Sequence, residues 1–205
     1  MALYSYVLDH DYGFAPNPFF GACTLATCKP QIRERAQVGD FIMGTGCAKR
    51  KRSGRFVYMM RVGEITTYDA YWSDPRFRRK RPCLDKGTAH AFGDNIYHHE
   101  PDGAWQQESS FHSLPNGRPN PLNRDHDTHS DHVLIGHDYV YFGGDGPLIP
   151  DRFRNWDGYD ICAGRAYKKQ FPPNMVAEMI VWGMGYGLGR QGNPADWVRM
   201  PEGAR

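Results

Sequence analysis

Two apolar runs in the first third of the chain form its clearest pattern. Residues 41–43 and 56–62 are almost entirely apolar, and a glycine-containing, strongly basic loop separates them. Gly39 and Asp40 come directly before the first run, and both residue types tolerate sharp turns. The pattern predicts two strands that pair as antiparallel neighbours across a long hairpin.

Other segments show the periodicities of further strands and of two helices. Alternation over residues 3–8 predicts a first strand, and the runs 132–136 and 139–142 predict two strands joined by a tight turn. Pro30 is suited to the first turn of a short helix that ends near Ala36. Apolar residues spaced by three and four positions within 174–186 predict the one long helix.

The remaining sequence is rich in residues that interrupt regular structure. The chain contains 23 Gly and 15 Pro, which predicts short helices and many loops. We expect a single domain over residues 1–205, with a loop-rich insertion at 82–131 and a tail at 190–205 that frays or closes over the surface. An apolar fraction of 40% is enough for a packed core and argues against disorder.

Charge and cysteine content narrow the class of protein further. A formal net charge of +2 excludes a uniformly basic nucleic-acid coat. No export signal and no apolar window of about 20 residues is visible, so we expect a soluble, cytoplasmic protein without a membrane partner. The five cysteines are an odd number, which favours reduced thiols over a disulfide framework.

The positive charge is concentrated in two clusters, at residues 49–55 and 76–81. Aromatic residues lie within or close to both clusters. Such surfaces neutralise phosphates and stack on bases. The alternative interpretation is a pair of solvated loops or helix faces. The candidate phosphate-binding residues are Lys49, Arg50, Lys51, Arg52, Arg55, Arg76, Arg78 and Arg79.

A segment at 123–132 holds three histidines and several aspartates, which suits acid–base chemistry. If it continues into a strand, His126 and His132 share one face while His129 points the other way, so a three-histidine metal site fails. We therefore predict no metal and no cofactor. The alternative is a hydrogen-bonded turn that positions the next strand. The candidate catalytic residues are His112, Asp127, His129 and Asp131.

Two further motifs bear on catalysis or on nucleotide binding. Cys23 follows a Pro-Phe-Phe-Gly loop and could act as a nucleophile beside a base, although a small buried filler is the alternative. The glycine-rich stretch 183–189 follows a helix instead of preceding one and lacks the Lys-Ser/Thr ending of a phosphate-binding loop, which excludes a P-loop or dinucleotide site.

Several motifs taken together resemble the second family of nucleotide-modification-associated domains, over about residues 4–190. That family is associated with enzymes that modify bases in phage and bacterial DNA. The resemblance implies a role in DNA modification, with nucleic acid, nucleotides or DNA-modification enzymes as partners. It is carried by residues 14–26, Cys28-Lys29-Pro30, Val38-Gly39-Asp40, Gly44-Thr45-Gly46, 71–77, 93–97 and 129–135.

The order of strands, short helix and basic hairpin is also similar to PUA-like domains, including the EVE and ASCH groups. This resemblance implies an α+β fold with a mixed β-barrel and a pocket that holds a modified or flipped nucleotide. Carried onto this sequence, it implies the nucleotide-binding residues Asn17, Phe19, Phe20, Thr24, Lys29, Thr45, Gly46, Asn95 and Tyr97.

Two functions follow from these observations. The first is recognition of a modified nucleobase or nucleotide, by aromatic stacking in a pocket and by basic clusters on phosphates. The second is a base- or nucleotide-modifying enzyme that uses His/Asp acid–base groups and Cys23 as nucleophile. A scaffold role is a third interpretation, because a fold alone does not define a function.

Overall fold

A computed structural model describes residues 1–164 and 166–197. The chain divides into two compact units. The first unit contains the described residues of segments 1–12, 36–63 and 136–197, and the second unit contains segments 13–35 and 64–135. No helix in the described ranges is long and apolar enough to cross a membrane.

The first unit is built on a six-stranded mixed sheet with the order β10-β1-β3-β4-β9-β11. Its central strands β3 and β4 pair in antiparallel fashion, which confirms the predicted hairpin, and β1 lies parallel to β3. Gly39 turns the chain into β3 with a φ of +95°. The strands are β1 (Leu3–Leu8), β3 (Phe41–Gly46), β4 (Phe56–Arg61), β9 (Tyr139–Tyr141), β10 (Tyr167–Lys168) and β11 (Gly189–Arg190).

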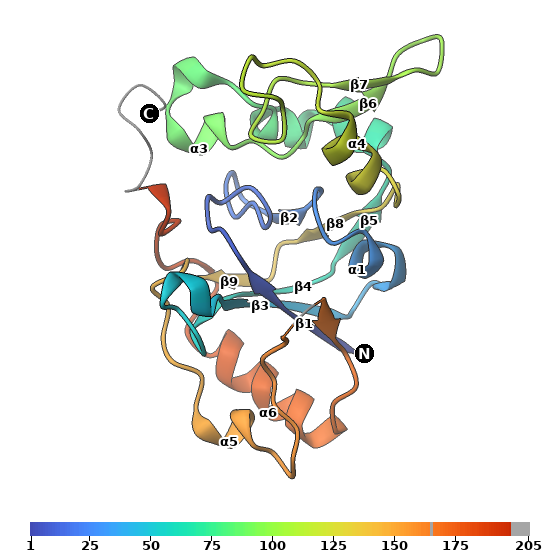
Figure 1. The fold of residues 1–205 in the computed structure, drawn as a ribbon. Coiled ribbons are helices and arrows are strands. Elements are labelled where there is room, and N and C mark those ends of the chain that lie inside the picture. The colour runs from blue at the N-terminus through green and yellow to red at the C-terminus, as the bar shows by residue number, and fades with distance from the viewer. Residues whose placement is uncertain (165, 198–205) are drawn as a thin grey trace. The chain divides into compact units, whose positions relative to one another are not determined.

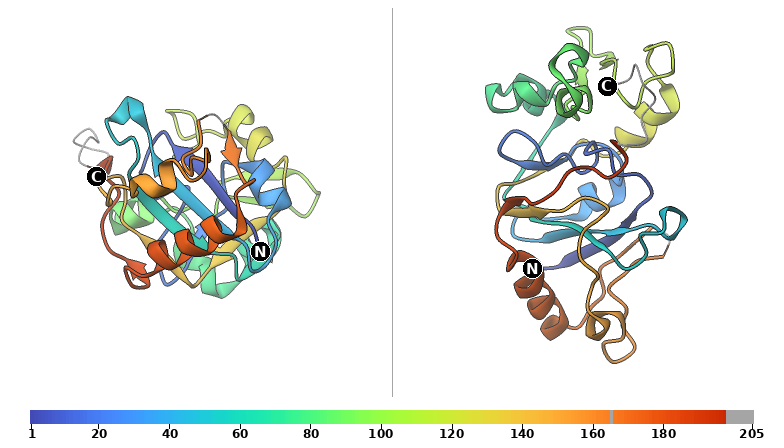
Figure 2. Two further views of the ribbon diagram at one scale, coloured as in Figure 1. Left: turned by 90° about the horizontal axis from the view of Figure 1, so that it is seen from below. Right: turned by 90° about the vertical axis from the view of Figure 1, so that its left-hand side faces the viewer.

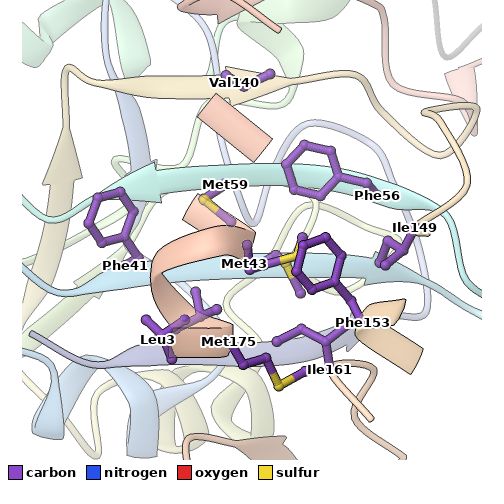
Figure 3. Packing of buried hydrophobic residues seen from close by; sticks show 12 residues of the cluster. Leu3, Phe41, Met43, Phe56, Met59, Val140, Ile149, Phe153, Ile161 and Met175 are labelled. Carbon is purple, nitrogen blue, oxygen red and sulfur yellow. The ribbon is translucent and has the colours of Figure 1, made fainter. Parts of the chain in front are cut away.

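The two helices of this unit, α5 (Asp151–Arg154) and α6 (Pro173–Met184), lie on one face of the sheet. The residues of α6 that are buried, Met175, Val176, Met179 and Gly183, recur at helical spacing, as the sequence pattern predicts. Figure 3 shows side chains of β3 and β4 packed with Phe153 of α5 and Met175 of α6. The apolar core of the first unit therefore lies between the sheet and these helices.

A register shift between β3 and β4 shapes this core. Gly44 pairs with Tyr58 and Thr45 with Phe56, so Val57 is an extra residue in β4. An extra residue reverses the alternation of side chains along a strand. Phe56 and Met59 both belong to the core cluster for this reason, although strict alternation would place them on opposite faces.

The second unit consists of shorter elements around a three-stranded sheet with the order β2-β8-β5, together with a two-stranded pair of β6 and β7. The strands are β2 (Cys23–Leu25), β5 (Glu64–Thr66), β6 (Tyr97–His99), β7 (Trp105–Gln107) and β8 (Val133–Gly136). The helices are α1 (Pro30–Arg35), α2 (Tyr68–Ser73), α3 (Thr88–Ala91) and α4 (Pro121–Asp127). The 3₁₀ helices are η1 (Ala48–Arg50) in the first unit and η2 (Pro75–Lys80) and η3 (Leu84–Lys86) in the second.

The structure differs from the expected fold in two respects. The six-stranded sheet has free edges at β10 and β11, and no sheet of the described ranges closes, so the fold is α+β with several sheets and a barrel is not confirmed. The runs 132–136 and 139–142 do form strands, but β8 belongs to one sheet and β9 to another. Each strand pairs with a strand that is distant in sequence: β8 pairs with β5, and β9 pairs with β4.

Segment 82–131 is less irregular than its composition suggests. It contains two short helices, one 3₁₀ turn and the β6–β7 hairpin, joined by loops. Asn120 caps α4 by accepting a hydrogen bond from the Leu122 amide, and Pro121 occupies the first turn. Part of the predicted tail, residues 198–205, lies outside the described residues.

Candidate functional site

Cys28 lies at a sharp turn between a strand and a helix of the second unit. After β2 ends at Leu25, Cys28 and Lys29 adopt φ angles of +57° and +43°, and Pro30 then begins α1. Residues other than glycine are uncommon in this region, and such backbone strain concentrates at functional positions. The buried Arg33 donates from Nε to the Cys28 carbonyl at 2.9 Å and from Nη1 to the Ser130 carbonyl at 2.8 Å. The turn is therefore held firmly, while Cys28 stays partly exposed.

His112 reaches Cys28 from a loop far along the chain. Its Nε2 lies 3.7 Å from Cys28 Sγ, within hydrogen-bonding range for sulfur. The Asn123 side chain of α4 donates to the His112 carbonyl at 2.8 Å, and the Phe14 ring packs on the imidazole with a centroid separation of 4.7 Å. The loop and the ring of His112 are therefore both fixed, and only 14% of the side chain is exposed.

Asp127 completes the arrangement from the last position of α4, where its side chain is fully buried. Its Oδ2 lies 2.7 Å from His112 Nδ1 and accepts a hydrogen bond from the Tyr97 hydroxyl at 3.0 Å. Its Oδ1 accepts from the Cys28 amide at 2.7 Å. One carboxylate thus fixes both the imidazole and the backbone of the cysteine.

Burial and hydrogen bonding shift the pKa values of Asp127 and His112 in opposite directions. Burial alone would raise the pKa of Asp127, but hydrogen bonds from His112 and His126 hold it well below its usual range. Burial alone would lower the pKa of His112, but its hydrogen bonds to Asp127 and Cys28 raise it to about 10. His112 is therefore an imidazolium at neutral pH, with one N–H directed at Asp127 and the other at the sulfur.

The geometry has the order nucleophile, base and orienting carboxylate that thiol and serine nucleophiles use on unrelated folds. Asp127 accepts the hydrogen bond of Nδ1–H, so Nε2 of His112 faces the sulfur and can exchange a proton with it. The Cys28 amide donates to Asp127 and is not available to stabilise a developing oxyanion. Within residues 1–164 and 166–197, no group of three His, Cys, Asp or Glu side chains gathers closely enough to hold a metal ion.

Of the predicted catalytic residues, the structure brings His112 and Asp127 together and leaves the others apart from them. The exposed Asp131 accepts a hydrogen bond from the Tyr68 amide at the start of α2. His129 is exposed to solvent. Cys23 is fully buried, and burial raises the pKa of its thiol. The thiol beside His112 belongs to Cys28 instead.

Three of the seven predicted nucleotide-binding residues of the second unit belong to a buried polar network. The ammonium group of Lys80, which is 1% exposed, donates to the carbonyl and the side-chain oxygen of Asn17 at 3.0 and 2.8 Å. Thr24 donates to Asp94 at 2.5 Å, and Asn95 donates to the Tyr71 carbonyl at 2.9 Å. Their polar groups are thus bonded inside the protein, except for the buried Asn95 Oδ1, which has no hydrogen-bond partner among the described residues.

The other predicted nucleotide-binding residues are divided between the two units. In the second unit Phe19 is buried, Tyr97 is bound to Asp127, and Phe20 and Lys29 are partly exposed. In the first unit Thr45 donates to the Tyr6 carbonyl at 3.3 Å, and Gly46 packs against the backbone of Arg52. Phe20 and Lys29 are thus the members of this set with exposed surface.

The basic clusters are partly neutralised within the protein. In cluster 49–55, Arg52 pairs with Asp196 at 3.1 Å, Arg50 donates to His10 and Arg55 to the Gly146 carbonyl, while Lys49 and Lys51 are exposed. In cluster 76–81, Arg76 pairs with Glu64 and Asp74 at 2.9 and 2.6 Å. Arg78 and Arg79 are exposed and have no ion pair with a described residue.

Sequence reasoning missed Cys28, Lys80 and Asp94 as members of polar clusters. Cys28 carried one usable signal, because it stands between a short strand and a helix that begins with Pro30, where a strand-to-helix turn can present a nucleophile. Lys80 carried none, since its neighbours in sequence are mainly basic and exposed.

The fold and this site together define an α+β protein that carries a cysteine–histidine–aspartate arrangement on short elements of its second unit. Comparison with curated proteins and with solved structures gave no match. The chain belongs to the family described as nucleotide modification associated domain 2, which matches residues 1–201. This confirms the resemblance found in the sequence and assigns the chain a role in nucleotide modification systems.

Proposed function

We propose that the chain is a nucleotide-modifying enzyme that uses Cys28 as its nucleophile, His112 as proton carrier and Asp127 as the group that orients His112. The observation that carries this proposal is the continuous contact from Cys28 Sγ to His112 Nε2 and from His112 Nδ1 to Asp127. It deepens the enzyme interpretation of the sequence and replaces Cys23 by Cys28 as the nucleophile.

The proposal is favoured over a purely binding module by how the candidate ligand-binding groups are used. The side-chain polar groups of Asn17, Thr24 and Tyr97, and the side-chain nitrogen of Asn95, bind partners inside the second unit. The buried Asn95 Oδ1 has no hydrogen-bond partner among the described residues. A recognition pocket needs polar groups that are free to reach a ligand. By contrast, Cys28 is partly exposed and has a base positioned beside it.

The reaction class that suits these groups is cleavage or transfer of an acyl-type group carried by a base or nucleotide. The sulfur attacks the electrophilic carbonyl carbon and forms a carbon–sulfur bond, and the proton held by His112 passes to the departing nitrogen or oxygen. Water then gives a proton to His112 and attacks the thioester, which releases the carboxylic acid. The sulfur and His112 thereby return to their starting protonation states, so the step consumes one water and needs no oxidant or metal.

Alkylation of Cys28 tests the proposal without knowledge of the substrate. The full chain is treated with iodoacetamide across a range of pH, and each cysteine is followed by peptide mass spectrometry. We expect Cys28 to react faster than Cys162, another partly exposed thiol, and to slow by roughly tenfold or more in His112→Asn. Equal rates for the two thiols, unchanged in His112→Asn, would overturn the proposal.

A turnover assay is the second test of the proposal. Purified protein is incubated with nucleotides and with DNA that carries acylated or otherwise modified bases, and the mass of every species is followed. Cys28→Ser should lower turnover by roughly a thousandfold or more, whereas Cys162→Ser should leave it unchanged. Full turnover by Cys28→Ser would remove the nucleophile from the mechanism.

A further inference from the structure

A strongly basic cavity of about 330 Å³ lies in the second unit between η2 and α3. Its charged and reactive lining residues are Arg78, Arg79, Arg81, Lys86, His90 and Cys83, and no carboxylate of residues 1–164 or 166–197 lines it. The volume falls at the lower end of small-ligand pockets, which span about 300–1,000 Å³. We call this cavity the basic pocket.

The fold of η2 explains why these cations gather on one side. A 3₁₀ helix has about three residues per turn, so residues three apart share a face. Phe77 and Lys80 face inward and are buried. Arg78 and Arg81 then share a second face, and both line the basic pocket.

The cations of the basic pocket form no ion pair inside the described ranges, although the charge of Glu108 acts on Arg81. Arg78, Arg79 and Lys86 form no ion pair there, in contrast to Arg76, which pairs with two carboxylates. Burial lowers the pKa of Arg81, and the neighbouring Arg78 lowers it further. The Nε atom of Arg81 is buried and has no hydrogen-bond partner among the described residues. Like charges held this closely favour a bound anion, which would relieve their repulsion.

Aromatic contacts connect the basic pocket with the surroundings of His112. Phe20 lies beneath the Arg79 guanidinium at 4.6 Å and against the His90 ring at 4.5 Å. Two residues after His90, the Phe92 ring contacts Phe111 at 5.4 Å. Phe111 packs on Phe14, which in turn packs on His112. Phe111 is 45% exposed, and an exposed ring of this kind can stack on a base.

We propose that the basic pocket binds a phosphate group of the substrate on which Cys28 acts. This proposal depends on the proposed function only in identifying the bound anion as part of the substrate. The cavity and its cations are present whatever the role of Cys28. Phosphate matches the planar, several-donor guanidinium groups of the pocket better than a single carboxylate would. The phosphate belongs either to a free nucleotide or to a nucleic-acid backbone, and the test below separates these sources.

Cys83 provides a direct readout of occupancy, because it lines the basic pocket. The full chain is alkylated with iodoacetamide in low salt, with and without inorganic pyrophosphate, a deoxynucleoside 5′-monophosphate, or a short single-stranded DNA. Peptide mass spectrometry then follows Cys83 and Cys28 separately. Protection of Cys83 by the monophosphate and pyrophosphate indicates a free nucleotide, and protection by DNA alone indicates a backbone phosphate.

Charge variants provide the matched comparison. Arg79→Gln should weaken binding of the protecting ligand about tenfold and lessen its salt dependence, because one charge-assisted contact is lost. Arg76→Gln removes the same charge from the same cluster but from a residue paired with Glu64 and Asp74, and should change affinity by less than about twofold. Equal weakening in both variants would indicate a general charge effect and overturn the specific site.

The result separates this proposal from the proposed function. No protection of Cys83 by any of the three ligands would overturn the phosphate site even if Cys28 reacts rapidly and depends on His112. Conversely, protected Cys83 with an unreactive Cys28 would remove the nucleophile while leaving the anion site supported.

Discussion

Replacing Asp127 by asparagine removes one buried charge and almost no volume. In the wild-type chain this carboxylate accepts hydrogen bonds from the Cys28 amide and the Tyr97 hydroxyl and pairs with His112. Asparagine can still accept one of these bonds with its oxygen, but it cannot balance an imidazolium. We therefore expect Asp127→Asn to lower the pKa of His112 and to destabilise the second unit.

The magnitude follows from the pKa of His112, which is about 10 in the folded chain against 6.5 for an unperturbed histidine. At about 1.4 kcal/mol for each tenfold change in proton affinity, the pairing stabilises the fold by up to about 5 kcal/mol. Breaking a buried ion pair commonly costs about 3–5 kcal/mol. The pKa of Asp127 reports the same interaction and is not added. We expect the free energy of unfolding to fall by about 3–5 kcal/mol.

The loss of stability in Asp127→Asn should change with pH in a defined direction. The contribution of His112 is fully present below its unfolded pKa of 6.5 and is lost as pH rises through about 10. The contribution of Asp127, whose pKa is depressed, is present above 3.8 and is lost as pH falls through its lower folded value. The difference between wild type and Asp127→Asn should therefore be largest between about pH 4 and pH 6.5 and should shrink towards pH 10.

Urea denaturation followed by tryptophan fluorescence measures this difference at about pH 5.5 and about pH 9.5. Asp125→Asn is the matched control, since Asp125 lies on the same helix but is exposed and pairs with the neighbouring Arg124. This substitution should cost less than about 1 kcal/mol. The reasoning is refuted if the two variants lose equal stability, or if the loss in Asp127→Asn is as large at the higher pH. Titration of the His112 ring by NMR checks the shift of its pKa directly.

Two further predictions concern packing and burial. Gly146→Ala should lower the free energy of unfolding by about 3 kcal/mol, because a Cβ there would lie 1.9 Å from the Phe56 carbonyl oxygen. Gly164→Ala, with no described atom within 4 Å of its Cβ, should be nearly neutral. Equal denaturation midpoints for the two variants would contradict this prediction. Burial lowers the pKa of Lys80 to about 8 from 10.5, so the unfolded chain binds more protons between these values. Wild type should gain up to about 3 kcal/mol relative to Lys80→Met as pH rises from 8 to 10.5, and a constant difference in denaturation experiments would refute the buried charge.

Local patterns were sufficient to predict most strands and the long helix. The hairpin of β3 and β4 could be predicted because its partners are close in sequence and both are apolar. The strands β8 and β9 were located from their apolar runs, but their partners were not, because short apolar runs carry no information about which distant strand they will pair with. The extra residue in β4 was likewise invisible to alternation.

The candidate site was predicted only in part. His112 and Asp127 were selected for their acid–base chemistry, yet their contact with Cys28 joins positions 84 and 99 residues apart. Such contacts depend on tertiary packing, which no local pattern encodes. Cys23 and Cys28 could not be ranked from sequence, because a buried strand and an exposed turn place chemically identical thiols in different environments. The burial of Lys80 could not be predicted for a similar reason, since it depends on the direction in which η2 places this side chain.

The way the chain alternates between its two units has a consequence for synthesis on the ribosome. Among the described residues, segments of the first unit are made at the beginning, in the middle and at the end, and those of the second unit lie between them. The described helices and strands of the second unit, together with Cys28, His112 and Asp127, exist once residue 136 has emerged. The central sheet of the first unit must wait for β9, β10 and β11. Emerging chains should therefore assemble the thiol cluster before that sheet is complete, with the early strands β1, β3 and β4 waiting for their last partners.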